Sequence, residues 1–307
     1  MTPRKNNAAS VKQRLLNLAR ERNEDFNALL TRYGIERLLY RLSRSEHAAD
    51  FVLKGAQLFH LWSDAPHRPT RDLDLLGTGA PDLPRLEAVF RSVCATVVED
   101  DGLDFPLDTV HAGRIRDDAE YEGIRVRLEA RLGVAHIRLQ VDIGFGDATP
   151  TPPDWVAFPV LLDQASPMLR AYRRESVVAE KLQAMVVLGL ANSRMKDFFD
   201  VRFLAIAFDF EGPELTRAIE ATFSRRRTPI PSAPPTALTE LFADSLEKKT
   251  QWRAFLNRSR LESKDLALPN VVESLRCFLL PPLEALAGGT PFDHRWNRGG
   301  PWRGTSS

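Results

Sequence analysis

The sequence predicts an α+β protein, in which a mixed β-sheet with flanking helices precedes a helical C-terminal part. Two segments on either side of Gly133 alternate apolar and polar residues, a period-two pattern typical of a β-hairpin. Beyond the prolines at 150–159, apolar residues recur every three or four positions, which is typical of helices. We therefore expect a sheet with one polar face and one apolar face, the latter covered by helices.

The composition of the chain excludes several classes of protein. The chain has 307 residues, of which 43% are hydrophobic and 27% charged, so disorder over its whole length is excluded. Its 42 Lys and Arg residues balance 41 Asp and Glu residues, and a site for a polyanion must therefore be local. Two cysteines, Cys94 and Cys277, are too few for a disulfide framework or a zinc site. The N-terminus lacks the apolar core of a signal peptide, and no apolar run is long enough to cross a membrane; these features predict a cytoplasmic protein without a membrane partner.

Residues 1–48 are predicted to form N-terminal helices. One helix is expected from Ser10, which has the capping-box spacing with Gln13, and apolar residues follow on one face. A second helical pattern begins near Asp25 and decays around Ser43. This stretch is locally basic, which fits either a solvated helix face or contact with a phosphate backbone.

Residues 49–165 are predicted to form the sheet. Its strands are indicated by short apolar or alternating runs that end at glycine, and its helices by apolar spacing and an N-cap. The expected elements are, in order, a strand at 51–53, a glycine turn at Lys54-Gly55, a helix at 56–62, a loop bracketed by Pro66 and Pro69, a strand at 70–76, a helix capped by Asp82, and strands at 124–129 and 137–143.

Prolines separate the sheet from the rest of the chain. Residues 166–290 are predicted to form a helical sub-domain that carries Lys181 and Asp197, because apolar residues recur there at helical spacing. Residues 291–307 are rich in Gly and Arg and end in Thr-Ser-Ser, so we expect a weakly ordered tail.

Two carboxylates mark the candidate site. Asp72 and Asp74 are two residues apart in a predicted strand, so both side chains leave the same face while Leu73 and Leu75 enter the core. Two like charges this close repel unless a cation neutralises them, and hard oxygen ligands favour Mg²⁺ or Mn²⁺. The alternative is that Asp-x-Asp occurs here by chance at an exposed strand end.

A third acid strengthens this hypothesis. Asp142 lies on the polar side of the strand at 137–143. If this strand lies beside the strand of Asp72, three carboxylates converge and can hold two ions. Asp142 would then complete the metal site or act as a base.

Phosphate donors are expected at the turn after the first strand. Lys54-Gly55 at a strand-to-helix turn offers an ammonium and backbone N–H groups. A single glycine is more often a simple turn, which is the alternative.

A second group of charged residues lies in the helical sub-domain. Lys181 follows Glu180 in an otherwise apolar helix, and Asp197 and Asp200 share one face of another. Lys181 could extend along the apolar surface to solvent, and Lys196 or Arg194 could pair with the two acids at the surface.

Four blocks of sequence together resemble the AbiEii/AbiGii toxin family, nucleotidyltransferases similar to the MenT tRNA-modifying toxins. The resemblance runs from about residue 51 to about residue 210. The blocks are Phe-Val-Leu-Lys54-Gly55-Ala56, Arg68-Pro-Thr-Arg-Asp72-Leu-Asp74-Leu, Glu180-Lys181-Leu-Gln-Ala184, and Arg194-Met-Lys196-Asp197-Phe-Phe-Asp200.

The resemblance implies a small nucleotidyltransferase sheet followed by a helical portion. It also implies that Asp72 and Asp74 hold the metal, that Lys181 contacts the nucleoside triphosphate, and that Asp197 or Asp200 is needed for activity. The family's turn usually carries Gly-Gly or Gly-Ser where this chain has Gly55-Ala56. A serine contact to the phosphates is thereby lost.

We therefore expect a metal-dependent nucleotidyltransferase toxin of a bacterial toxin–antitoxin or phage-defence system. It would transfer a nucleoside monophosphate from an NTP to RNA, at the tRNA 3′ acceptor end, with an antitoxin protein as a further partner. The expected catalytic residues are Asp72, Asp74, Asp142, Lys181, Asp197 and Asp200; the metal ligands are Asp72, Asp74 and Asp142; the nucleotide-binding residues are Lys54, Gly55, Ala56, Arg71, Lys181 and Lys196.

Basic clusters could guide the RNA. They are Arg170 with Arg173 and Arg174, Arg125 with Arg127, and Arg225-Arg226-Arg227. Two alternatives remain open: the acceptor is a protein hydroxyl or a small molecule such as an aminoglycoside, or the chain is a non-catalytic nucleotide-binding partner of an antitoxin.

Overall fold

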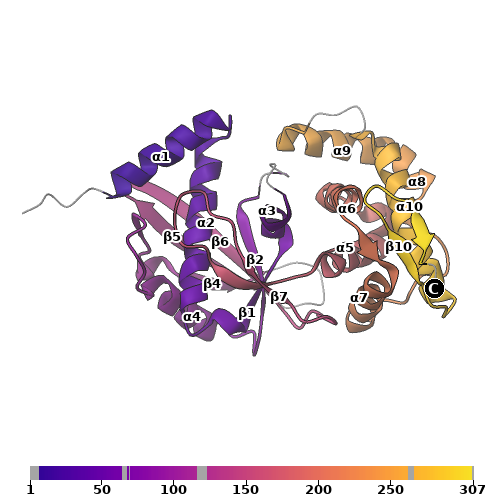
Figure 1. Cartoon of the computed structure of the whole chain (residues 1–307), viewed down its shortest axis with the longest axis horizontal. Coiled ribbons are helices and arrows are strands. Elements are labelled where there is room, and N and C mark those ends of the chain that lie inside the picture. Colours follow the sequence, from indigo (N-terminus) through magenta and orange to yellow (C-terminus); the bar gives the residue numbers. More distant parts are fainter. Residues whose placement is uncertain (1–6, 64–67, 69, 116–122, 262–265, 306–307) are drawn as a thin grey trace, which may run out of the picture. The chain divides into compact units, whose positions relative to one another are not determined.

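The computed structural model describes residues 7–63, 68, 70–115, 123–261 and 266–305, and the chain forms two units (Figure 1). Unit 1 comprises Met1–Gly146 and Pro153–Tyr172, and unit 2 comprises Asp147–Pro152 and Arg173–Ser307. The α+β class, with a mixed sheet followed by a helical part, is confirmed. The expected loop at Pro66 and Pro69 lies, apart from Arg68, outside the described residues.

Unit 1 is built on a mixed sheet. Its strand order is β3-β5-β6-β2-β1-β8-β7, with β4 also paired to β5. Two pairs are parallel, β2 with β6 and β1 with β8, and the other pairs are antiparallel. The strands are β1 (Phe51–Lys54), β2 (Asp72–Gly77), β3 (Leu103–Asp104), β4 (His111–Arg114), β5 (Ile124–Leu132), β6 (Ala135–Phe145), β7 (Asp154–Ala157) and β8 (Met168–Ala171).

The predicted hairpin is the pair β5–β6. Gly133 adopts a left-handed backbone with φ of 61°, which a glycine tolerates without strain, and the pairing closes at Leu132 and Ala135. The alternating apolar residues of both strands are buried, and their charged neighbours lie on the other face.

Helices cover the apolar face of this sheet. They include α1 (Asn7–Glu21), α2 (Phe26–Arg44) and α4 (Leu83–Ala95), with α2 against β6 and α4 against β5. Asp82 caps α4 as predicted, and Asp25, near which the second helix was expected to begin, caps α2; each accepts a backbone N–H three residues on. The expected cap at Ser10 is wrong, because α1 already begins at Asn7.

The boundary expected at residue 165 is also corrected. Strand β8 pairs in parallel with β1, Val52 with Arg170, so the sheet continues past that point and unit 1 runs to Tyr172. The helix expected at 56–62 is a short 3-10 turn, η2 (Gly55–Leu58), followed by α3 (Phe59–Trp62).

Unit 2 is mainly helical. In it α5 packs against α6 and α7, and α10 packs against α6, α7 and α8. Its elements are α5 (Arg174–Leu188), η4 (Gly189–Ala191), α6 (Met195–Ala207), β9 (Phe210–Glu211), α7 (Gly212–Arg225), η5 (Thr236–Leu238), α8 (Glu240–Asp244), α9 (Leu246–Ser259), α10 (Leu268–Ala287), β10 (His294–Trp296) and β11 (Trp302–Gly304).

The expectation of a weakly ordered tail at 291–307 is wrong for the described part of that segment. Strand β10 pairs with both β9 and β11. An indole N–H group anchors each of the last two strands: Trp296 of β10 donates to the Ala205 carbonyl at 2.7 Å, and Trp302 of β11 donates to the Phe278 carbonyl at 2.9 Å. Burial of these large rings outweighs the local glycine content.

None of the described helices combines the length and the apolar character needed to cross a bilayer.

Candidate functional site

Within unit 1, several of the predicted site residues lie on the polar face of the sheet. Strand β2 buries Leu73 and Leu75 and leaves Asp72 exposed and Asp74 half-buried. In the parallel pair β2–β6, Asp74 lies opposite Asp142. The two strands that carry the three acids are therefore neighbours, and the side chains of opposed residues leave the same face.

Asp142 is held by an arginine. Arg125, its opposite residue on β5, donates from Nε to Oδ1 and from Nη2 to Oδ2, each at 2.8 Å. This bidentate pair engages both carboxylate oxygens. Among the described residues, no group of three or more His, Cys, Asp or Glu side chains is arranged to hold a metal ion.

Asp72 and Asp74 have a donor set that fits a hard divalent cation, since each presents carboxylate oxygens on the same face of one strand. The turn after β1 leaves room for one of them. Gly55 has φ of +69°, and a Cβ there would lie 2.0 Å from Asp74 Oδ2. Only glycine therefore lets the Asp74 carboxylate lie against this turn.

The predicted phosphate turn is placed against the same acids. Lys54 is the β1 residue opposite Asp74, and its Nζ lies 5.3 Å from the centre of the Tyr172 ring. Ala56 follows in η2, whose four residues are too short to provide the helix N-terminus that the sequence suggested. Arg71 is exposed just before β2.

Within unit 2, the predicted residues Lys181, Asp197 and Asp200 form a buried ion cluster. Lys181 Nζ on α5 lies 2.6 Å from Asp197 Oδ1 and 2.8 Å from Asp200 Oδ2, both on α6. Arg194 Nε lies 2.6 Å from the other oxygen of Asp197. The carboxyl groups of Asp197 and Asp200 are fully buried, and the Lys181 side chain is 12% exposed.

This cluster corrects the surface alternatives. Asp197 and Asp200 do not form a surface arrangement, and Lys181 does not extend to solvent. Burial pushes the pKa of Asp197 up, but Lys181 and Arg194 outweigh it and hold that pKa below the ordinary value. Lys196 is exposed and is not one of the residues of this cluster.

The basic clusters are only partly free for a ligand. Arg170 donates to the Ala49 carbonyl at 3.1 Å, and the Arg174 guanidinium lies 4.4 Å from the centre of the Phe208 ring. Arg226 is partly buried and donates to Gln183 and Asp147, each at 3.0 Å. By contrast Arg127, on the polar face of the sheet, is exposed.

Sequence reasoning missed two residues. One is Arg125 as the partner of Asp142, which the register of a two-residue hairpin turn would have given. The other is Gln57 on η2, which is buried and whose Nε2 donates to the Asp72 carbonyl at 3.2 Å. A lone glutamine after a glycine turn carries no sequence signal for that contact.

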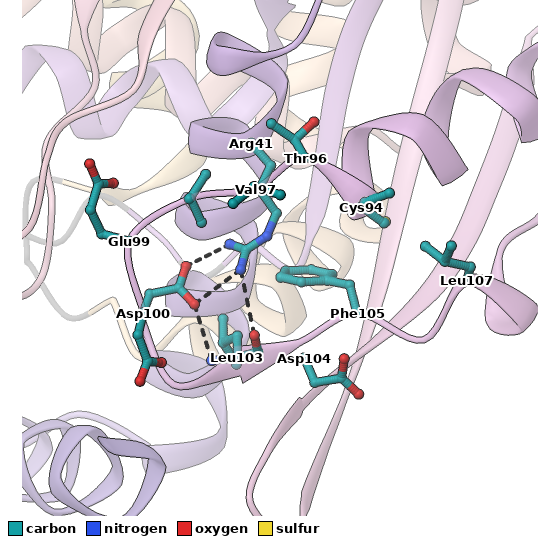
Figure 2. A pocket seen from close by; sticks show the side chains of 13 residues that line it. Arg41, Cys94, Thr96, Val97, Glu99, Asp100, Leu103, Asp104, Phe105 and Leu107 are labelled. Carbon is teal, nitrogen blue, oxygen red and sulfur yellow. Dashed lines mark hydrogen bonds and ion pairs between the residues drawn. The ribbon is translucent and has the colours of Figure 1, made fainter. Parts of the chain in front are cut away.

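A separate pocket of about 440 Å³ lies elsewhere in unit 1 and is lined by none of the predicted site residues (Figure 2). Arg41 projects into it over the Phe105 ring and bonds Asp101 and the Leu103 carbonyl. Glu99 and Asp104 also line it (Figure 2). The Arg41 guanidinium, the cation among the lining residues, is thus engaged by other lining groups.

The sequence matches a family model described as "Nucleotidyl transferase AbiEii toxin, Type IV TA system" over residues 37–280. The structure is similar to MenT4, a nucleotidyltransferase toxin from Mycobacterium tuberculosis H37Rv, with a TM-score of 0.50, 17% identity, and coverage of 89% of this chain and 98% of that one. It is also similar to JHP933 from Helicobacter pylori, with a TM-score of 0.45, 17% identity, and coverage of 85% and 90%. No curated protein matches the chain at a significant level. At these identities the structural likeness concerns the fold.

Proposed function

Because the chain belongs to the AbiEii family of nucleotidyltransferase toxins, we propose that it transfers a nucleoside monophosphate from an NTP to the 3′ acceptor end of tRNA, with the help of a divalent metal. The observation that carries this proposal is the pair Asp72 and Asp74 on one strand face, with Gly55 leaving space for the Asp74 carboxylate. The family match supports the nucleotidyltransferase reaction. The arrangement of Asp72 and Asp74 supports their assignment to that reaction.

Asp72 and Asp74 would hold Mg²⁺ or Mn²⁺. When bound, such an ion neutralises charge on the triphosphate. In the transfer, the acceptor hydroxyl oxygen bonds to the α-phosphorus, the bond from that phosphorus to the bridging oxygen of the β-phosphate breaks, and pyrophosphate leaves. Asp142 is the third acid of the proposal, as ligand or as the base that takes the hydroxyl proton. The pair with Arg125 uses one lone pair on each carboxylate oxygen and so orients Asp142 while a second lone pair on each oxygen remains.

In unit 1 the proposed nucleotide-binding residues are Lys54 and Arg71, with the backbone of Gly55 and Ala56. In unit 2 they are Lys181, which would contact the triphosphate, and Lys196. Asp197 and Asp200 would orient the Lys181 ammonium, which the short contacts to both acids support.

An RNA acceptor is favoured by a basic row on the same sheet face. Asp72 lies opposite Gln140, Gln140 lies opposite Arg127, and Arg127 lies opposite His111. Arg138, further along β6, is exposed like Arg127. Strands lie about 4.8 Å apart, so a polyanion whose end reaches Asp72 would run over these arginines. A small sugar or antibiotic would not extend that far.

The test is label transfer from radioactive NTPs to tRNA with Asp72→Asn. We expect transfer to be lost while the urea unfolding midpoint is kept, because Asp72 is an exposed residue. Asp104→Asn is the matched control, an exposed acid of the same sheet, and should transfer normally. Undiminished transfer by Asp72→Asn would reject the assignment.

Separate incubations with total RNA, protein lysate and aminoglycosides distinguish the acceptors. Label on RNA alone supports the proposal, and label on protein or antibiotic supports the alternative acceptor. The same proposal includes a cytoplasmic toxin with an antitoxin partner, acting in phage defence. Toxicity on expression that is relieved by co-expression of a neighbouring gene is the expected result.

A further inference from the structure

A glutamine is buried in the turn between β1 and the acid-bearing strand. Gln57 lies on η2, two residues after Gly55, and only 1% of its surface is exposed. Buried amide groups are normally satisfied by hydrogen bonds, because an unpaired one carries a desolvation penalty. The contacts of Gln57 therefore indicate what it does.

Only one end of the amide is used. Nε2 donates to the backbone carbonyl of Asp72 at 3.2 Å. Oε1 is buried and has no hydrogen-bond partner in the part of the chain that the structure describes. An apolar side chain of the same shape would fill this space without leaving a buried oxygen unpaired. For the fold alone, glutamine is thus the poorer choice.

The carbonyl of Asp72 lies where the β1–β2 ladder ends. The register of that ladder runs from Phe51 opposite Gly77 to Lys54 opposite Asp74. The chain then turns at Gly55, so no β1 residue stands opposite Asp72. The Gln57 amide takes that place and ties the turn to the first residue of β2.

We propose that Gln57 is a positioning residue, which fixes Asp72 relative to the Lys54–Ala56 turn and acts on the reaction through Asp72. This inference rests on the proposed function, in which Asp72 is a metal ligand and the turn binds phosphate. A misplacement of a reacting group by about 1 Å lowers the rate on the order of a hundredfold. The loss of one hydrogen bond that positions Asp72 is therefore expected to lower the rate measurably.

The first variant is Gln57→Met, which keeps the length of the side chain and removes both polar atoms. We expect a urea midpoint equal to or above that of the wild type, a kcat roughly tenfold to a hundredfold lower, and a raised apparent constant for Mg²⁺. Gln164→Met is the control. It removes another partly buried glutamine amide of unit 1, which bonds Tyr33, and should leave kcat unchanged.

The second variant is Gln57→Asn, which keeps the amide and shortens the side chain by one methylene. The amide then no longer reaches the Asp72 carbonyl, so kcat should fall and the apparent constant for Mg²⁺ should rise, as in Gln57→Met. If Gln57 only packed, this variant would lower the urea midpoint and leave the apparent constant for Mg²⁺ unchanged.

Wild-type kcat and wild-type Mg²⁺ dependence in Gln57→Met would overturn the inference, as would a loss of activity that merely follows a lost fold. An unchanged apparent constant for Mg²⁺ in Gln57→Asn would overturn it too. The proposed function is judged separately. If Asp72→Asn is inactive and Gln57→Met is normal, only the role of Gln57 is lost, whereas an active Asp72→Asn removes the basis of both.

Discussion

Lys181 compensates two buried carboxylates at once. Its Nζ lies within 2.8 Å of an oxygen of both Asp197 and Asp200, and Arg194 adds a second cation at Asp197. Removing one partner of a buried ion pair leaves the other charge without compensation, which is far more costly than breaking a surface pair. A loss of activity on changing Lys181 therefore has two physical causes, and these must be separated.

We expect Lys181→Met to lower the free energy of unfolding by about 3–5 kcal/mol. Adding Asp200→Asn to this variant removes the buried charge that Lys181 compensated, whereas Asp197 keeps Arg194, so the double variant should recover part of that stability without recovering transfer. Urea unfolding and label transfer measure the two effects. Lys196→Met, an exposed neighbour, should leave stability unchanged. If the double variant regains transfer, Lys181 does not contact the triphosphate.

The role of Asp142 can be tested by comparing a variant of Asp142 with a variant of its partner Arg125. If Asp142 is a metal ligand, Asp142→Asn should raise the apparent Mg²⁺ constant, whereas Arg125→Ala should leave it unchanged or lower it by freeing the carboxylate. If the pair is only structural, the two variants should behave alike. Mg²⁺ titrations of the transfer rate decide between these outcomes.

At the scale of elements, α2 is joined to the rest of unit 1 by buried charges. Arg37 and Arg41 both contact Asp101, with Arg37 Nε at 3.2 Å from Oδ2. Glu36 accepts the Leu161 N–H at 2.7 Å. Burial raises the pKa of Glu36 to about 7, against the lowering effects of the Leu161 N–H and Arg37.

This shift predicts how stability depends on pH. The folded protein keeps Glu36 protonated up to about pH 7, whereas the unfolded chain loses that proton near 4.5. The folded state therefore binds more protons between these values, and the contribution of Glu36 to stability falls as the pH rises through this window, by at most ~3 kcal/mol. Glu36→Gln should abolish this difference, as seen in urea midpoints at pH 5 and pH 8. Glu21→Gln, an exposed acid of α1, should keep the wild-type profile.

The elements also show what sequence can predict. The long alternations of β5 and β6 and the caps at Asp25 and Asp82 were predictable, because these signals are local. The cluster of Lys181 with Asp197 and Asp200 was not, because it depends on how α5 packs on α6. Strand β10 escaped prediction for a similar reason. Its three residues are stabilised by the burial of Trp296 and by β9, far away in sequence.

At the scale of the molecule, the numbers of basic and acidic residues are nearly equal, 42 against 41. Any affinity for nucleic acid therefore depends on where the basic residues lie on the surface. We expect Arg127→Gln combined with Arg138→Gln to weaken tRNA binding and to reduce the slope of log K against log salt by about 1 per arginine. Arg20→Gln, an exposed arginine of α1, is the control and should retain the slope. An unchanged slope in the double variant would remove the sheet face from the RNA path.

The passage of the chain between its two units has a consequence for biosynthesis. Asp147 lies in the short segment of unit 2 between β6 and β7, and its hydrogen-bond partner Arg226 is 79 residues further along the chain. At about 5–20 residues per second, a ribosome needs roughly 4–16 s to make that stretch. All eight strands of the large sheet are translated before Arg226 exists. All strands of the large sheet are therefore available for pairing while the short piece between β6 and β7 still lacks its anchor, and in this interval a chaperone would meet an incompletely folded chain.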